Sequence, residues 1–445
     1  MNHSPAGQAI FGWSAAWIAS LVFIAVYALV ISEKINRAIL ALLGAGLMIL
    51  CGVLTQEAAI RGVDFNTIGL LLGMMVIVAI TGKSGVFQYV AIWSAKKVNA
   101  QPVGVMIMLS LVTAVFSALL DNVTTVLLIV PVTLLITEEL KVPAYPYLLA
   151  EILCSNIGGT ATLIGDPPNI MIGSAVGIPF NDFVINLAPV VVVILLLTVV
   201  IFHFVWGKEL VTSEKARQRV MSFHEREAIK DPRLLKQALF VLFCVIGGFV
   251  MAHSAHIEPA TIAMFGAALL LLLDNFHRPA EEQSHNVHHS FGEAEWVTLM
   301  FFLGLFILVH GLESAGVIQW MAQQLLNATG GDFKVTAIAI LWGSAILSAF
   351  IDNIPFVATM IPMIKSMAPT FGGDQALMPL WWALSLGACL GGNGTLIGAS
   401  ANLVVAGIAE RAGQPVRFMQ FMKSSFLLML MSIAISHVYI YLRYL

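Results

Sequence analysis

The sequence contains few charged residues. Of 445 residues, 11% are charged and 59% are hydrophobic, whereas soluble globular proteins carry about 25% charged residues. So few polar side chains cannot cover a water-facing surface of this size, and the hydrophobic residues form runs long enough to cross a hydrocarbon layer of roughly 30 Å. The composition disfavours a soluble enzyme and predicts an all-α polytopic protein of the lipid bilayer.

Other features are also scarce. The net charge of −3 gives no basic field for nucleic acid. The four cysteines lie in hydrophobic runs without paired spacing, so neither a disulfide framework nor a zinc site is expected. The first Lys or Arg is Lys34, too late for a cleavable signal peptide. A phosphate-binding loop would need glycine where the chain has Ile77. We therefore expect that the protein is not an enzyme, does not hydrolyse ATP, and holds neither a cofactor nor a metal site.

Hydrophobic runs give ten candidate spans, at 13–32, 38–55, 66–82, 147–175, 187–206, 237–253, 259–275, 296–312, 378–408 and 424–442. Two further hydrophobic pieces, 103–137 and 335–367, hold an Asp-Asn pair at their centres, Asp121-Asn122 and Asp352-Asn353. Such a pair suits the tip of a re-entrant helical hairpin whose non-helical backbone is shielded by protein. Two ordinary spans joined by a short polar loop are the alternative.

Basic residues indicate the orientation. If both pieces are re-entrant and the N-terminus lies outside, 18 of the 22 Lys and Arg residues fall in inner segments, where membrane proteins collect them. Eight of these lie in the charged segment 207–236, which reads as a solvated cytoplasmic linker or surface helix. Docking of a partner there is the alternative.

The two halves of the chain resemble each other. DNVTTVLLIVP from Asp121 aligns with DNIPFVATMIP from Asp352 at an offset of 231, and IGGTATLIGDPPN from Ile157 aligns with LGGNGTLIGASAN from Leu390 at an offset of 233. Five crossings separate the copies, so the second is inverted, as in secondary transporters. We expect a first repeat over 1–206, the linker 207–236 and a second repeat over 237–445, with hairpins entering from opposite sides.

The fourth span of each half contains glycines and small polar residues, which predict two half-helices joined by unwound chain. Free backbone groups at such breaks can bind an ion or a hydroxylated solute, and close helix packing is the alternative role of these residues. The candidate substrate-binding residues are Asn122, Thr124, Thr125, Asn156, Thr160, Thr162, Asn169, Asn353, Asn393, Thr395, Ser400 and Asn402.

Three carboxylates within hydrophobic segments are candidates for proton or ion coupling, since such groups are costly there. Asp121 and Asp352 align with each other, and each either binds a proton or Na⁺ or caps the helix that follows it. Asp166 aligns with Ala399, so it breaks the symmetry and is the best candidate for the coupling residue. Its alternative role is a helix N-cap before Pro167.

The central motifs contain no Arg or Lys. A tightly held multivalent anion would therefore have no ionic partner in them. This inventory of amides and hydroxyls favours a neutral polyhydroxyl solute or a small cation over a di- or tricarboxylate.

A family resemblance is carried by four stretches, DNVTTVLLIVP, SNIGGTATLIGDPPNIMIGSA, DNIPFVATMIP and LGGNGTLIGASAN. Together they closely resemble the ion-transporter superfamily, in particular its branch of arsenite permeases and pink-eyed-dilution (P) proteins. The resemblance implies inverted repeats with two opposed hairpins and two broken helices. It also implies transport of arsenite or antimonite, exchange of Na⁺ for H⁺, or carriage of dicarboxylates.

The function expected from the sequence is arsenite or antimonite export across a bacterial cytoplasmic membrane, by proton antiport with alternating access. Bacterial members of this branch are commonly arsenite permeases, sometimes coupled to a separate ATPase subunit, so such a subunit is a possible partner. A Na⁺/H⁺ antiporter is the first alternative, and a dicarboxylate carrier is the next.

Overall fold

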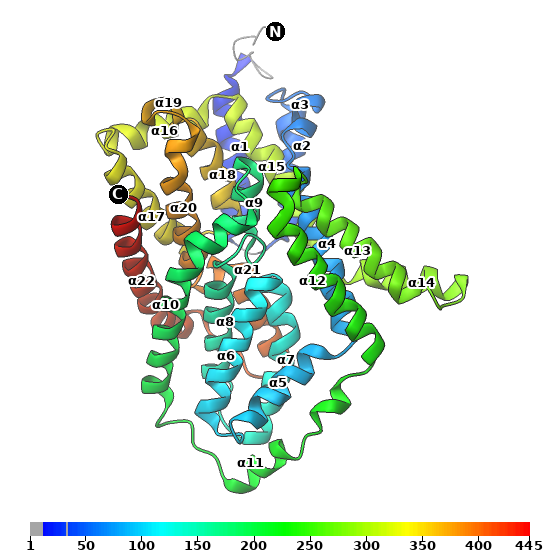
Figure 1. Ribbon diagram of the computed structural model, residues 1–445. Helices are drawn as coiled ribbons and strands as arrows, with labels where there is room; N and C mark the ends of the chain where they lie inside the picture. Colours follow the sequence, from blue (N-terminus) through cyan, green and yellow to red (C-terminus); the bar gives the residue numbers. More distant parts are fainter. Residues whose placement is uncertain (1–11, 33) are drawn as a thin grey trace.

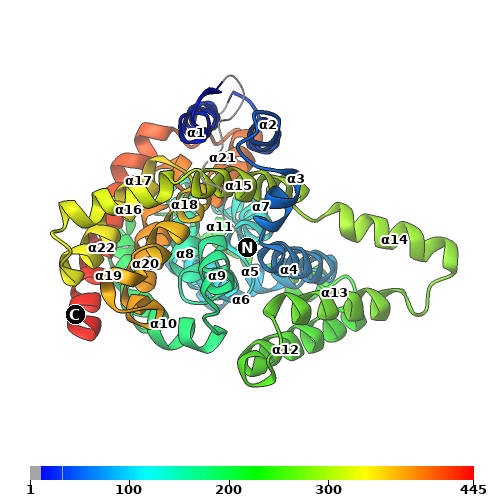
Figure 2. The ribbon, with the colours of Figure 1, turned by 90° about the horizontal axis from the view of Figure 1, so that it is seen from above.

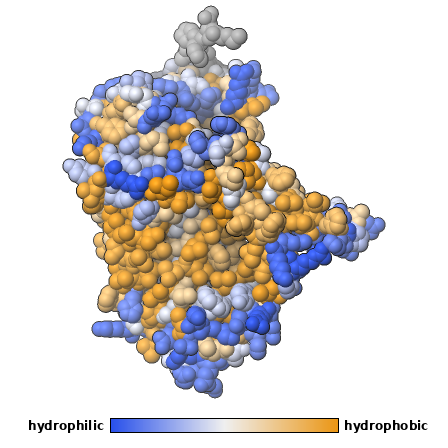
Figure 3. Space-filling model, viewed as in Figure 1, coloured by the Kyte–Doolittle hydropathy of each residue, from blue (hydrophilic) through white to orange (hydrophobic). Residues whose placement is uncertain are grey.

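The computed structural model describes residues 12–32 and 34–445, and its elements are all helices. Eight helices are long and apolar enough to cross a membrane, and three shorter helices are also apolar. Figure 3 shows a hydrophobic band across the middle of one face of the molecule, between more hydrophilic ends. Large apolar side chains such as Phe204, Phe243 and Leu442 are more than 70% exposed, as expected where lipid covers the protein. The predicted all-α polytopic fold is confirmed.

The first half of the chain contains five spans and one hairpin. Its helices are α1 (Ala15–Ile31), α2 (Arg37–Leu50), α3 (Gln56–Arg61), α4 (Phe65–Lys83), α5 (Val86–Lys97), α6 (Pro102–Leu119), α7 (Asn122–Leu140), α8 (Tyr145–Gly159), α9 (Pro167–Val176) and α10 (Phe180–Trp206). Helices α6 and α7 form the first hairpin. Helices α8 and α9 are the two pieces of the first broken helix.

The second half repeats this order. Its helices are α12 (Pro232–Ala255), α13 (Pro259–Asn275), α14 (Ala280–Gly292), α15 (Trp296–Ser314), α16 (Val317–Ala328), α17 (Phe333–Phe350), α18 (Asn353–Lys365), α19 (Ala368–Phe371), α20 (Met378–Gly391), α21 (Ser400–Arg411) and α22 (Phe418–Tyr444), with short 3₁₀ turns at Asp374–Leu377 and Leu396–Gly398. Helices α17 and α18 form the second hairpin, and α20 and α21 form the second broken helix.

The two halves are inverted, as the repeats predict. Helix α11 (Glu214–Met221), which joins the halves, lies at one end of the molecule, and α16 and α19 lie at the other (Figure 1). The first hairpin occupies the part of the molecule toward α11, and the second hairpin occupies the opposite part. Packing follows the same symmetry, because α2 packs on α15 while α4 packs on α13.

Glycines permit close contact between each hairpin and its broken helix. A Cβ at Gly158 of α8 would lie 2.1 Å from the carbonyl oxygen of Ala114 in α6. The equivalent Cβ at Gly391 of α20 would lie 2.6 Å from the carbonyl oxygen of Ala345 in α17. Small residues let helix backbones approach closely in a membrane. These glycines therefore have the predicted packing role in both halves.

Several helices outside the spans were not predicted. Helices α5 and α16 follow the third span of each half and precede its hairpin. Helix α14 projects from the body of the molecule beyond α13 (Figures 1 and 2). The Lys83 ammonium at the end of α4 holds it by donating to Asn286 Oδ1 at 3.0 Å and Ser290 Oγ at 2.7 Å. These short segments of mixed composition lack the long apolar runs on which the prediction of spans relied.

Candidate functional site

Each hairpin tip places an aspartate at the start of its second helix. Asp121 Oδ1 accepts a hydrogen bond from the Thr124 amide at 2.8 Å, and Asp352 Oδ1 accepts one from the Ile354 amide at 3.1 Å. Both aspartates therefore cap a helix N-terminus, where the helix dipole also favours negative charge. This capping was one of the two predicted roles.

Asp166 sits at the N-cap position of α9, but its side chain makes no capping hydrogen bond. Pro167 and Pro168 follow it, so the first two residues of the helix offer no amide hydrogen. The carboxylate instead accepts from Asn353 Nδ2 at 3.3 and 3.4 Å. Asp166 is completely buried, and the donors beside it, the Asn353 amide and the Cys389 thiol, are both neutral. Asp166 thus occupies the N-cap position that its predicted alternative role names, although its side chain makes no capping hydrogen bond.

Asparagines from both halves form one buried network. The Asn156 amide donates to Asn393 Oδ1 and to Asn402 Oδ1, both at 2.9 Å, and its own oxygen accepts from Asn122 at 3.2 Å. Asn402 donates to the carbonyl oxygens of Gly392 and Thr395, at 2.8 and 2.9 Å. These amides are thus bonded to protein across the interface between the halves, although the sequence indicated that they were available to a solute.

The other predicted polar residues are also largely paired. Thr160, Thr162 and Thr395 donate to backbone carbonyl oxygens. Asn169 donates to the backbone of the first break and accepts from Ser385 Oγ at 2.6 Å. The exceptions lie at the first tip, where Asp121 Oδ2, Asn122 Oδ1 and Thr125 Oγ1 are buried without a hydrogen-bond partner in the described structure.

A small cavity lies between the two tips. Its volume is about 20 Å³, which is room for about one water molecule. It is lined by Leu71, Met75, Asp121, Asn122, Val123, Asp166, Pro167, Glu295, Thr298, Asn353, Ile354 and Ser400. Three of these residues are acidic, and no Lys or Arg is among them. Burial raises the pKa of Glu295, which precedes α15, and the nearby Asp121 raises it further.

Arg37 corrects the expectation that no cationic side chain reaches the central motifs. Its Nη1 lies 2.6 Å from Asp352 Oδ2 and 2.6 Å from Ser400 Oγ, and its Nη2 lies 3.3 Å from Thr298 Oγ1. The expectation counted only residues within the hairpins and breaks, whereas Arg37 precedes Asp352 by 315 positions. No local pattern in the sequence marked Arg37 or Glu295, because only packing brings α2 and α15 to the second tip.

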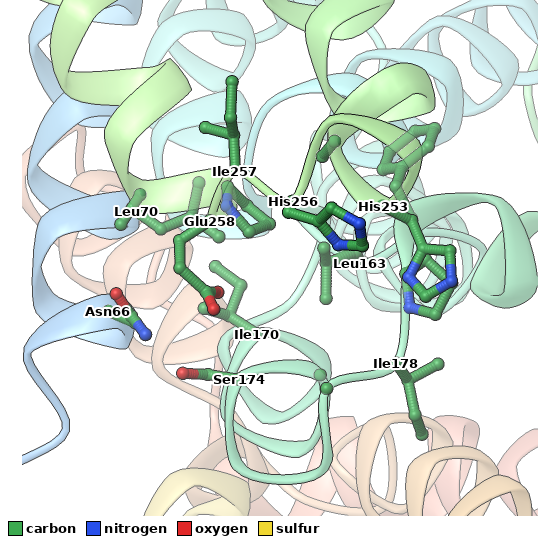
Figure 4. A pocket seen from close by; sticks show the side chains of 17 residues that line it. Asn66, Leu70, Leu163, Ile170, Ser174, Ile178, His253, His256, Ile257 and Glu258 are labelled. Atoms are coloured by element: carbon green, nitrogen blue, oxygen red, sulfur yellow. The ribbon is translucent and has the colours of Figure 1, made fainter.

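Two larger crevices flank the broken helices, and the repeats relate them. The first, of about 260 Å³, lies between the first broken helix and the connection of α12 to α13. In Figure 4, Glu258, Asn66 and Ser174 gather on one side of it, and His253 and His256 lie on the other. The second, of about 340 Å³, lies where α1 joins α2, beside Ile397 and Leu403, and is lined by Asn36, Arg37 and Asp352.

Comparisons with known proteins identify the family. A profile of the citrate transporter family matches residues 27–387. An uncharacterised transporter of Mycobacterium tuberculosis is 42% identical over 431 residues, which are 96% of this chain and 98% of the relative. The P protein of Sus scrofa is 33% identical over 504 residues; the match covers 95% of this chain but 59% of the P protein.

A solved structure supports the fold. The YdaH transporter of Alcanivorax borkumensis superposes with a TM-score of 0.59 over 97% of this chain and 99% of that one, at 14% sequence identity. At this identity the likeness concerns the fold alone. The family profile and the relatives extend the resemblance seen in the four sequence stretches to nearly the whole chain. The chain belongs to the citrate transporter family, within the ion-transporter superfamily, and is a multi-pass membrane transporter.

Proposed function

We propose that the protein is a secondary active transporter that exchanges a monovalent cation, Na⁺, for protons by alternating access. The observation that carries this proposal is the excess of acid between the hairpin tips. Asp121, Asp166 and Glu295 line the cavity, and the nearby Arg37 is already paired with Asp352. A buried carboxylate without a cationic partner has to bind a proton or a cation.

The two carboxylates of the first half have different roles in this proposal. Asp121 caps α7, and the helix dipole and the Thr124 amide stabilise its ionised form. With Asn122 Oδ1 and Thr125 Oγ1 it offers oxygen atoms that lack partners, the type of ligand that hard cations prefer. Asp166 has no such stabilisation and is the residue that exchanges protons. The size of the cavity suits a single ion.

Arsenite or antimonite export is the second candidate. Arsenite is an uncharged trihydroxy compound at neutral pH, so the acidic cavity would not repel it, and the crevice beside Arg37 is roomy enough for a small solute. The pairing of the predicted asparagines with each other weakens this candidate relative to Na⁺. Citrate, after which the family is named, and dicarboxylates rank below both candidates, because the acidic tips would repel an anion that arrives without accompanying cations.

The orientation is also a proposal. We propose a bacterial cytoplasmic membrane with α11 inside and the N-terminus outside, because most basic residues then lie inside; the terminus itself, 1–11, falls outside the described residues. The proposed division remains 1–206, 207–236 and 237–445, with the linker as the place where an ATPase subunit would dock. In a cysteine-free background, Gln218→Cys of α11 should react from inside and Thr370→Cys of α19 from outside. Both residues are exposed, and reversed labelling would overturn this orientation.

Transport in proteoliposomes tests the function. With an imposed pH gradient, the wild type should release protons from acid-loaded vesicles when Na⁺ is added, and Asp166→Asn should abolish this response while the protein stays folded. Glu313→Gln is a matched control, because Glu313 is half-exposed and lies away from the tips. Arsenite accumulation in inverted vesicles tests the second candidate. Proton movement that does not depend on Na⁺ would refute the proposal. Full coupling of proton and Na⁺ movement in Asp166→Asn would refute it as well.

A further inference from the structure

The guanidinium of Arg37 is held like a bound cation at the second hairpin tip. Oxygen atoms of Asp352, Ser400 and Thr298 surround it at 2.6 to 3.3 Å, and the Phe301 ring lies 5.0 Å from its central carbon. The Arg37 side chain is 22% exposed and that of Asp352 is 9% exposed. Arg37 belongs to α2, whereas Asp352 and Ser400 belong to the second hairpin and the second broken helix, so the cation comes from a separate part of the fold.

The first hairpin tip has no equivalent of Arg37. The repeats match α2 with α13, and α13 begins at Pro259 as α2 begins at Arg37. Proline has no charge to offer. Asp121, which aligns with Asp352, correspondingly keeps one carboxylate oxygen without a hydrogen-bond partner in the described structure.

The crevices show the same asymmetry. The one beside α2 carries Arg37 and Asn36 next to the tip aspartate. The one beside α13 carries Glu258 at the place of Asn36, together with His253 and His256, and neither Lys nor Arg lines it (Figure 4). Hydroxyl groups differ as well, because Thr125 of the first tip aligns with Phe356 of the second. The second tip thus holds a fixed cation, and the first tip holds oxygen atoms without one.

We infer that the guanidinium of Arg37 is a resident cation that takes, at the second tip, the place that an exchangeable cation takes at the first. The consequence for stoichiometry rests on the proposed function: one exchangeable cation site would serve the whole molecule, although the fold is built from two repeats. The occupancy of the second tip would then not vary with the cation concentration.

Replacing Arg37 tests this inference through stability, without any transport assay. The full chain in nanodiscs is heated at increasing low-millimolar guanidinium or NaCl, with choline chloride keeping the ionic strength constant. Arg37→Ala should gain a saturable rise of Tm with guanidinium, and a smaller one with Na⁺, that the wild type lacks. Arg37→Lys, which keeps a cation, should gain less. Arg411→Ala, an exposed arginine at the end of α21, is the matched control and should behave as wild type.

A double variant separates a cation site from a packing role. Arg37→Ala with Asp352→Asn should fold and lose the acquired response, because the carboxylate that binds the cation is gone. Two results would overturn the inference. The first is an Arg37→Ala variant whose Tm responds to both cations as that of the wild type does. The second is an unstable Arg37→Ala variant that is stabilised neither by guanidinium nor by the added Asp352→Asn change, since Arg37 would then act through packing. Full coupling in Asp166→Asn vesicles would refute the proposed function and leave this result standing.

Discussion

Asn156 connects the two halves of the protein, and its removal gives the sharpest structural prediction. Its amide nitrogen donates to Asn393 and Asn402, and no other described donor reaches either acceptor oxygen. Asn156→Ala leaves both oxygens buried and unpaired, and it removes the acceptor of the Asn122 amide as well. Each orphaned acceptor costs about 1–3 kcal/mol in soluble proteins, whereas interhelical bonds in membranes average about 0.6 kcal/mol. For the three lost hydrogen bonds we expect a loss of roughly 2 kcal/mol of unfolding free energy.

The repeat provides an internal control for this prediction. Cys389 aligns with Asn156 and contacts Asn169 of the other half, with its Sγ 3.6 Å from Asn169 Oδ1. That oxygen also accepts from Ser385, so Cys389→Ala orphans nothing and should cost less than about 1 kcal/mol. Thermal or denaturant unfolding in a fixed detergent compares the two variants. A double-mutant cycle of Asn156→Ala with Asn402→Ala should show coupling of at least about 0.5 kcal/mol. Equal losses for Asn156→Ala and Cys389→Ala, or additive changes in the cycle, would refute this reasoning.

Three further predictions concern other parts of the molecule. Gly158→Ala should destabilise the protein by about 1–3 kcal/mol, because its Cβ would meet the Ala114 carbonyl oxygen at 2.1 Å; Gly46→Ala, with open space around it, is the control in the same unfolding assay. Burial raises the pKa of Glu295 from 4.5, so the folded state binds its proton more tightly and stability is lost as pH rises above that value. Glu295→Gln should therefore raise Tm at neutral pH but not at acid pH. An equal change of Tm at both pH values would contradict a raised pKa of Glu295 in the folded state. Lys83→Met should free α14, which hydrogen exchange would detect as faster exchange confined to α14 and its contacts; unchanged exchange would mean that other contacts hold it.

Much of the fold was predictable because it depends on local patterns. The hydrophobic runs marked the spans, since a helix must be apolar over the thickness of the bilayer. The Asp-Asn pairs marked both tips, because an aspartate can cap a helix that starts within protein. The inversion followed from counting crossings between the copies. Helices such as α5, α14 and α16 were missed, since their mixed composition carries no signal of membrane crossing.

The candidate site was predictable as a set of residues but not as a set of contacts. Asn156, Asn393 and Asn402 do meet, as their places in the breaks suggested. They satisfy one another, however, and this pairing depends on how the two halves dock. Asp166 was singled out because its aligned residue is Ala399, but its bond to Asn353 of the other half was not foreseeable from its own neighbours in sequence.

The sequence by itself determined the membrane class, the two inverted repeats, the hairpins, the breaks and the polar residues near them, because each depends on composition or on spacing within one segment. Only the tertiary structure decided which polar groups are left free and which charges face each other. Arg37 reads as an ordinary charged residue near the start of α2, and the packing of α2 on α15 carries it to Asp352. Charge balance between the tips depends on distances across the halves, and no segment of sequence encodes those distances alone.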